Sequence, residues 1–113
     1  MNVVIKKTQR NDGPVLYVRG EIDAYTAPQV SKQLLPLVTE AEAKNVSVDL
    51  RDVSYMDSTG VGVLIGALKA SRQSGCQLVL ENVTPRIERL FRITGLSEII
   101  PVKPLGGEAK EWE

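Results

Sequence analysis

The sequence contains no histidine and a single cysteine, Cys76. Without histidine the chain cannot build a Ser-His-Asp or Cys-His nucleophile system, and one cysteine does not supply the missing ligands of a typical zinc site. An intrachain disulfide is impossible, which fits a reducing compartment, and we expect Cys76 to be a small buried apolar residue. These absences argue against an enzyme that uses common nucleophilic or zinc chemistry.

Long apolar runs and an excess of one charge are also missing. No run approaches the roughly 18 residues of a membrane span, and the N-terminus lacks the layout of a signal peptide. Lys and Arg number 14, as do Asp and Glu, so the zero net charge indicates no nucleic-acid partner. No phosphate-loop, dinucleotide or calcium-loop motif occurs. We therefore expect a cytoplasmic protein without membrane contact, cofactor or metal.

The length and composition suit one globular domain. The chain has 113 residues, of which 42% are hydrophobic. We predict a domain at residues 1–103 and a loosely ordered tail at 104–113, in which the placement of Trp112 stays open. Two local charge clusters are expected to be solvated surface; these are Arg86, Arg89 and Arg92, and the tail residues Glu108, Glu111 and Glu113.

Hydrophobic periodicity and turn residues predict alternating strands and helices. The predicted strands span residues 3–8, 15–18, 46–50, 77–80 and 99–102. The predicted helices begin at Thr26, span 58–74, and run between caps at Thr84 and Gly95. A turn at 11–14 makes the first two strands an antiparallel hairpin, whose pairing Gly20 is expected to end. Helical crossovers favour parallel pairing elsewhere, so we predict a mixed α/β sheet of four to five strands with helices mainly on one face.

The first helix carries specific signals at its start and in its interior. Thr26 and Gln29 have the spacing of a capping box, and Tyr25 and Val30 occupy the positions of a hydrophobic staple. Pro36 lies inside the helical pattern and predicts a bend, because an interior proline removes one hydrogen bond.

The segment from Asp57 to Gly62 reads Asp-Ser-Thr-Gly-Val-Gly and lies where a strand ends and a helix begins. Helix N-termini have free N–H groups and a partial positive charge, which favour a phosphate or a carboxylate. Ser58 is therefore a candidate for phosphorylation, although serine and aspartate are also ordinary N-cap residues. The segment predicts a regulatory site rather than a catalytic centre.

Two further features belong to the same region. Asp23 follows the second predicted strand, so it shares one edge with Ser58 if the two strands are neighbours. Glycines at 60, 62 and 66 each cost about 1 kcal/mol relative to alanine inside a helix. Either close packing on the sheet or the approach of a partner's backbone would explain them.

These motifs together resemble the anti-sigma-factor antagonists, the single-domain STAS proteins of bacteria. The resemblance covers residues 3–102 and lies in three segments: Asp49-Leu50 with Val53 and 57–64, Gly20-Glu21-Ile22-Asp23 with Ala27-Pro28, and Gly95-Leu96. It implies a STAS-type fold and a partner-switching function without enzymatic activity. The unphosphorylated protein would bind an anti-sigma factor that is also a serine kinase, and so release a sigma factor.

The resemblance also implies roles for individual residues. Phosphorylation at Ser58 would switch binding off, and a serine phosphatase would restore it. The residues expected to contact the partner are Asp23, Asp57, Ser58, Thr59, Gly60 and Gly62. The resemblance also implies a monomer or a weak dimer. The alternative function is a non-switching scaffold subunit of a transporter or stress-signalling complex, whereas a Ser58 nucleophile would lack a histidine base.

Overall fold

The computed structural model describes residues 2–40 and 44–105, which form strands and helices in alternation. The strands are β1 (Val3–Arg10), β2 (Gly13–Ile22), β3 (Asn45–Met56), β4 (Gln77–Val83) and β5 (Val102–Pro104). The helices are α1 (Ala27–Thr39), α2 (Ser58–Ser74), α3 (Pro85–Thr94) and the short 3-10 helix η1 (Leu96–Glu98). The predicted order of elements is confirmed, and α2 has the predicted bounds.

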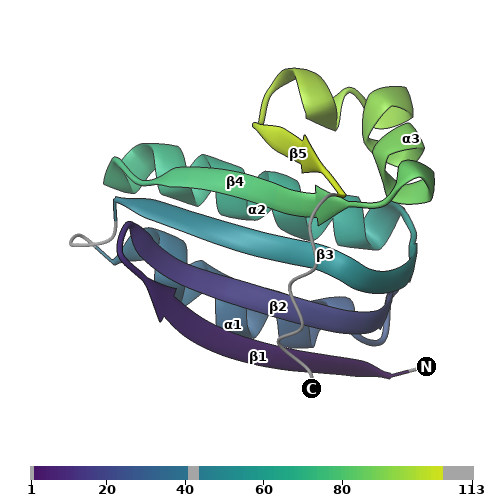
Figure 1. The fold of residues 1–113 in the computed structure, drawn as a ribbon, viewed down its shortest axis with the longest axis horizontal. Helices are drawn as coiled ribbons and strands as arrows, with labels where there is room; N and C mark the ends of the chain where they lie inside the picture. The colour runs from purple at the N-terminus through teal and green to yellow at the C-terminus, as the bar shows by residue number, and fades with distance from the viewer. Residues whose placement is uncertain (1, 41–43, 106–113) are drawn as a thin grey trace.

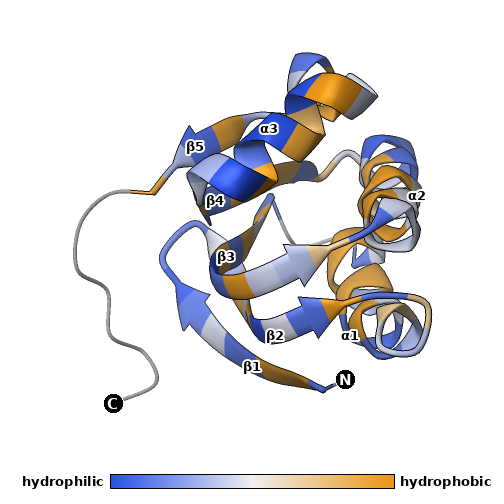
Figure 2. Cartoon of the chain, turned by 90° about the vertical axis from the view of Figure 1, so that its right-hand side faces the viewer, coloured by the Kyte–Doolittle hydropathy of each residue, from blue (hydrophilic) through white to orange (hydrophobic). Residues whose placement is uncertain are grey.

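The five strands form one mixed sheet in the order β1-β2-β3-β4-β5, with β3 in the centre as predicted. β1 is antiparallel to β2, whereas β2, β3, β4 and β5 pair in parallel. Helices α1 and α2 lie side by side on one face of the sheet, and α3 lies above its β4 and β5 end (Figures 1 and 2). The predicted α/β class with helices mainly on one face is therefore confirmed.

The core lies between the sheet and the helices α1 and α2. Apolar residues at helical spacing on α1 are buried as the periodicity predicted; they are Val30, Leu34, Leu37 and Val38. The helix runs from Ala27 to Thr39 through Pro36. Cys76 is buried, as expected for a small apolar residue. This packing holds β2 and β3 against α1 and α2.

The predicted limits of the strands are too short or displaced: β1, β2, β3 and β4 all extend further than predicted, and β5 lies later in the chain. Gly20 ends the pairing of the hairpin as predicted, because Val3 opposite Gly20 is the last pair between β1 and β2, but β2 itself continues to Ile22 along β3. The φ of 114° at Gly20 is one that other residues rarely adopt, and Gly20 lies at an irregularity in the pairing with β3. β3 is longer than predicted, and β5 lies at Val102–Pro104 instead of 99–102 because Ile100 is buried in the core. The rest of the predicted tail, 106–113 with Trp112, lies outside the described residues.

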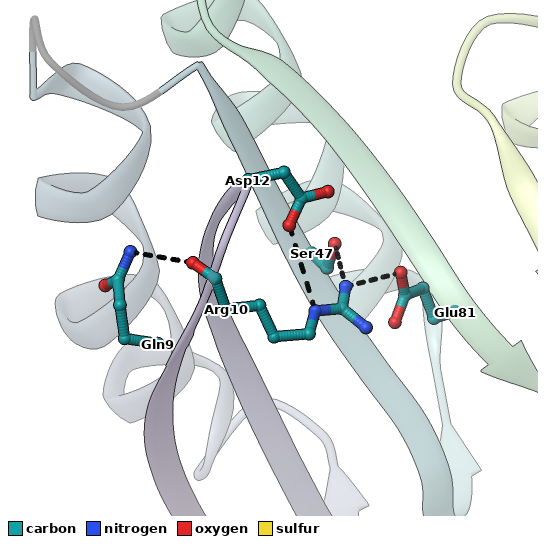
Figure 3. Close-up of polar contacts among 5 residues, drawn as sticks. All are labelled: Gln9, Arg10, Asp12, Ser47 and Glu81. Carbon is teal, nitrogen blue, oxygen red and sulfur yellow. Dashed lines mark hydrogen bonds and ion pairs between the residues drawn. The ribbon is translucent and has the colours of Figure 1, made fainter.

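A polar cluster ties β1 to β3 and β4 on the sheet face opposite α1 and α2 (Figure 3). Nη2 of Arg10 donates to Oγ of Ser47 at 2.9 Å and to Oε2 of Glu81 at 2.7 Å. The hydrogen bond to Glu81 raises the pKa of Arg10 above its ordinary value. Asp12 lies 4.0 Å from Nε of the same guanidinium. One side chain therefore joins three strands that are not all adjacent.

Replacing Arg10 with alanine should lower the free energy of unfolding by about 1 kcal/mol, because two charge-assisted hydrogen bonds are lost on a half-exposed surface. Urea denaturation measures this change. Lys7→Ala is the matched control, since Lys7 is exposed on the same strand. Equal stability of the two variants would contradict a stabilising role for the Arg10 cluster.

Candidate functional site

Asp57 is the N-cap of α2, and it also links the ends of two strands. Its Oδ1 accepts hydrogen bonds from the backbone N–H of Thr59 at 2.9 Å and of Gly60 at 3.3 Å. Its own N–H donates to the carbonyl of Ile22, the last residue of β2, at 3.2 Å. The carboxylate thus satisfies two of the helix's free donors, while the backbone fixes the corner between β3 and α2 against β2.

Ser58 is the first residue of α2 and is not its cap. Its side chain is exposed, and among the residues that the structure describes its hydroxyl makes no hydrogen bond. The side chain of the next residue, Thr59, is also exposed. The interpretation of Ser58 as an ordinary N-cap is therefore wrong, because Asp57 performs that function. Both hydroxyls are accessible without any change in the fold.

Asp23 lies beyond the end of β2, at the edge where β3 leads into α2. The expected pairing of the two strands is confirmed, with Ile22 opposite Met56 in a parallel register. Oδ1 of Asp23 accepts hydrogen bonds from the N–H groups of Tyr25 at 2.9 Å and Thr26 at 3.0 Å. Asp23 is only 6% exposed, so it is part of a turn that packs against the domain rather than a solvated acid.

The predicted cap of α1 is wrong in its details. Thr26 is the N-cap residue, but its side chain makes no capping hydrogen bond to the helix. Its hydroxyl instead donates to the carbonyl of Glu21 at 2.7 Å and accepts from the N–H of Asp23 at 2.9 Å. Tyr25 is 83% exposed, so it forms no hydrophobic staple. The Thr26 carbonyl therefore accepts the first hydrogen bonds of α1, while its side chain closes the turn that holds Asp23 instead of capping the helix.

The turn keeps Asp23 ionised at neutral pH. Burial raises the pKa of Asp23, but hydrogen bonds from the N–H groups of Thr26 and Tyr25, together with the Thr26 hydroxyl, lower it further than burial raises it. The net pKa lies below the ordinary value of 3.8. Oδ2 of Asp23 is buried and has no hydrogen-bond partner within the described part of the chain.

Asp23 and Asp57 line one shallow groove of about 350 Å³, which we call the acidic groove. The residues that line it are Glu21, Asp23, Ala24, Tyr25, Tyr55 and Asp57. Sequence reasoning missed the two tyrosines, although each stands two residues from one of the aspartates. The groove brings the acids of the two predicted motifs together and places aromatic rings beside them.

The three glycines of α2 divide into two groups. Gly60 is buried, and a Cβ there would lie 2.6 Å from Cγ of Met56 and 2.8 Å from Cγ2 of Ile22. A Cβ at Gly62 or Gly66 would meet nothing within 4 Å. Close packing therefore explains Gly60 alone. The other two leave a smooth, open strip of helix backbone on the outer side of α2.

Within residues 2–40 and 44–105, no group of three or more side chains lies close enough to hold a metal ion. No helix in these ranges is long and apolar enough to cross a membrane. The site is thus made of carboxylates, hydroxyls, tyrosine rings and exposed helix backbone.

Comparisons with known proteins identify the family and the fold of the chain. Residues 3–109 match the STAS domain family. A protein of Listeria monocytogenes named anti-sigma-B factor antagonist is 48% identical over 109 residues, which are 96% of this chain and 95% of the relative. An anti-sigma factor antagonist from Mycobacterium paratuberculosis superposes with a TM-score of 0.76 at 24% identity, over 91% of this chain and 86% of that one.

The phosphorylated form of SpoIIAA, a Bacillus cell-fate determinant, superposes with a TM-score of 0.69 at 19% identity, over 96% of this chain and 93% of that one. The mixed sheet and the matched residues define a STAS domain. The chain belongs to the family of anti-sigma factor antagonists, which are regulatory proteins and not enzymes. The resemblance drawn from the sequence motifs is confirmed.

Substitutions at two glycines of α2 should change stability in opposite directions. Gly60→Ala should destabilise the protein by about 1–3 kcal/mol, because the new methyl group overlaps buried side chains of Met56 and Ile22. Gly62→Ala should stabilise it by up to about 1 kcal/mol, because alanine favours the helix and nothing obstructs its Cβ. Chemical denaturation of both variants tests this contrast, which a shared sign of the two changes would refute.

The lowered pKa of Asp23 predicts how stability depends on pH. The carboxylate stabilises the native state above the ordinary pKa of 3.8, and this contribution is lost as the pH falls through the lower native value. Asp23→Asn should therefore be less stable than the wild type at neutral pH, with the difference shrinking in acid. Thermal melts from pH 7 to pH 2 measure the difference, with Asp52→Asn as an exposed control. A constant difference would contradict the assignment.

Proposed function

We propose that the unphosphorylated protein binds an anti-sigma factor through the acidic groove and the first turn of α2, and thereby frees a sigma factor in the cytoplasm. The anti-sigma factor acts as a serine kinase on Ser58, the phosphorylated protein dissociates, and a serine phosphatase restores binding. One observation carries the proposal: Ser58 is exposed and makes no hydrogen bond with the described residues, directly beside the capping Asp57. The name of the Listeria relative supports the choice of partner.

Phosphorylation at Ser58 should leave the fold intact. The Ser58 hydroxyl supports no other described group, so its modification breaks no contact there. Oδ1 of Asp57 already accepts hydrogen bonds from the N–H groups of Thr59 and Gly60. A phosphate therefore stays at the surface next to that carboxylate, where the positive end of the helix still favours an anion. The modification changes the surface and not the domain.

The same phosphate should prevent docking. It adds a charge of about −1.5 to −2 at neutral pH. The charge appears close to Asp57 and on the same edge as the ionised Asp23, so a partner that complements two acids meets added bulk and an altered field. SpoIIAA, which shares the fold, is known in phosphorylated and unphosphorylated forms. We infer the same two states for this chain.

The first turn of α2 supplies the rest of the contact. Gly60 lets this turn pack closely against Met56 and Ile22, and the open backbone at Gly62 allows a partner to approach closely. Thr59 presents a second exposed hydroxyl, and Ser58 is the favoured site because it follows the capping acid directly. We propose that the protein acts as a monomer or a weak dimer.

The proposal is tested by purifying the wild type, Ser58→Ala and Ser58→Asp, and capturing their partners from the native cytosol. The wild type and Ser58→Ala should retain a kinase-like protein, whereas Ser58→Asp should bind it at least about tenfold more weakly, because the carboxylate imitates part of the phosphate charge. With ATP, mass spectrometry should find phosphate on the wild type and none on Ser58→Ala. Thr59→Ala serves as the control for the neighbouring hydroxyl and should still be phosphorylated.

Equal binding of the wild type and Ser58→Asp would reject the switch. A stable complex that ignores the state of Ser58 would favour the alternative function, a non-switching scaffold subunit. Full phosphorylation of Ser58→Ala would reject the site and point to Thr59.

A further inference from the structure

A second groove, which we call the α3 groove, lies between the end of β3 and helix α3. Its volume is about 290 Å³, and it is largely apolar. Its apolar lining comes from Tyr55, Met56, Ile87, Leu90 and Ile93, and two arginines, Arg86 and Arg89, line it as well. In the ribbon α3 lies at the end of the sheet where β4 ends (Figure 1).

The α3 groove exposes apolar surface that the fold does not use. Helix α3 buries only Ile87 and Phe91, so its core-facing stripe is narrow. Ile93, one turn beyond Leu90, is 76% exposed, and Tyr55 is 44% exposed. Large apolar side chains grouped on a surface that is otherwise charged are typical of a protein contact.

The two arginines are available to a partner. Arg86 and Arg89 are exposed, and within the described ranges neither takes part in a hydrogen bond or an ion pair. A guanidinium prefers a carboxylate, which it binds through two parallel hydrogen bonds. The groove therefore suits a segment that carries an apolar side chain next to acidic ones.

Tyr55 joins the α3 groove to the acidic groove, because it lines both. Asp23 and Asp57 line the first of these grooves with it, and Arg86 and Arg89 line the second. The two grooves thus form one continuous surface with an acidic half beside Ser58 and a basic half on α3. A surface with this charge division accepts a complementary partner in a single orientation.

We propose that the α3 groove is the second half of the docking surface for the anti-sigma factor, and that it receives a partner segment with an apolar side chain flanked by carboxylates. This inference rests on the proposed function and adds to it the chemistry of the partner. Phosphorylation acts on the acidic half, whereas the basic half supplies affinity and orientation in the unphosphorylated state.

The test measures the affinity of purified variants for the anti-sigma factor that the wild type captures, using isothermal titration calorimetry. The double variant Arg86→Glu/Arg89→Glu should bind about tenfold more weakly, because two attractive charges become repulsive, and its binding should depend less on salt. Ile93→Ala should also weaken binding, by roughly tenfold, if its side chain is buried by the partner. Thermal melts should match the wild type, since these side chains are exposed.

Arg92→Glu is the matched control, because Arg92 is exposed on the same helix but does not line the groove. It should bind within about twofold of the wild type, since an exposed charge outside a contact contributes little. Folded groove variants that bind like the wild type would overturn the inference, even where Ser58→Asp abolishes binding. Weakened groove variants combined with normal binding of Ser58→Asp would support the groove and reject the switch. Variants that change only self-association in sedimentation would overturn it by assigning the groove to a second copy of the chain.

Discussion

The hydrogen bonds of Asp57 are the constraint on which the site depends. Its carboxylate holds the N–H groups of Thr59 and Gly60, while its own N–H is bound to the carbonyl of Ile22. The first contact starts α2, and the second fixes that start beside the end of β2. Because Asp57 caps the helix, the hydroxyl of Ser58 is not needed to stabilise the start of α2. This independence from the fold is what the proposed phosphorylation of Ser58 requires.

Helix α2 packs closely on one side and is open on the other. Gly60 faces inward, where Met56 and Ile22 leave no room for a Cβ, so it allows the helix to approach the sheet closely. Gly62 and Gly66 face outward into open space. Each glycine destabilises the helix relative to alanine, and close packing within the domain does not explain either one. The free energy lost at these two positions is consistent with a surface that serves a partner. The same helix thereby supports the core and presents an open backbone to the outside.

The polar groups of the domain have different tasks according to their surroundings. On the sheet face away from α1 and α2, Arg10 joins Ser47 and Glu81 across three strands and is part of the framework. At the end of β2 and β3, Asp23 is held charged by backbone donors although it is almost fully buried. On α3, Arg89 has no partner within the described residues and faces outward. Charges paired within the domain stabilise it, whereas unpaired charges on the surface belong to the docking surface that we propose.

Much of this arrangement follows from local sequence. The bounds of α2 and the buried stripe of α1 were predictable because periodicity and end signals act over a few neighbouring residues, and the neighbouring positions of β2 and β3 followed from the connections between them. Only the structure showed that the Thr26 side chain closes a turn with Glu21 and Asp23 instead of capping α1. Only the tertiary structure decided that β2 continues past Gly20, because its partner there is β3, a distant segment of the chain. The grooves that meet at Tyr55 were equally hidden, since exposure depends on how distant elements pack. Sequence alone determined which elements form and that Ser58 stands at the start of a helix, because these features depend on neighbouring residues, while packing between distant segments decided which side chains remain exposed and unpaired among the described residues.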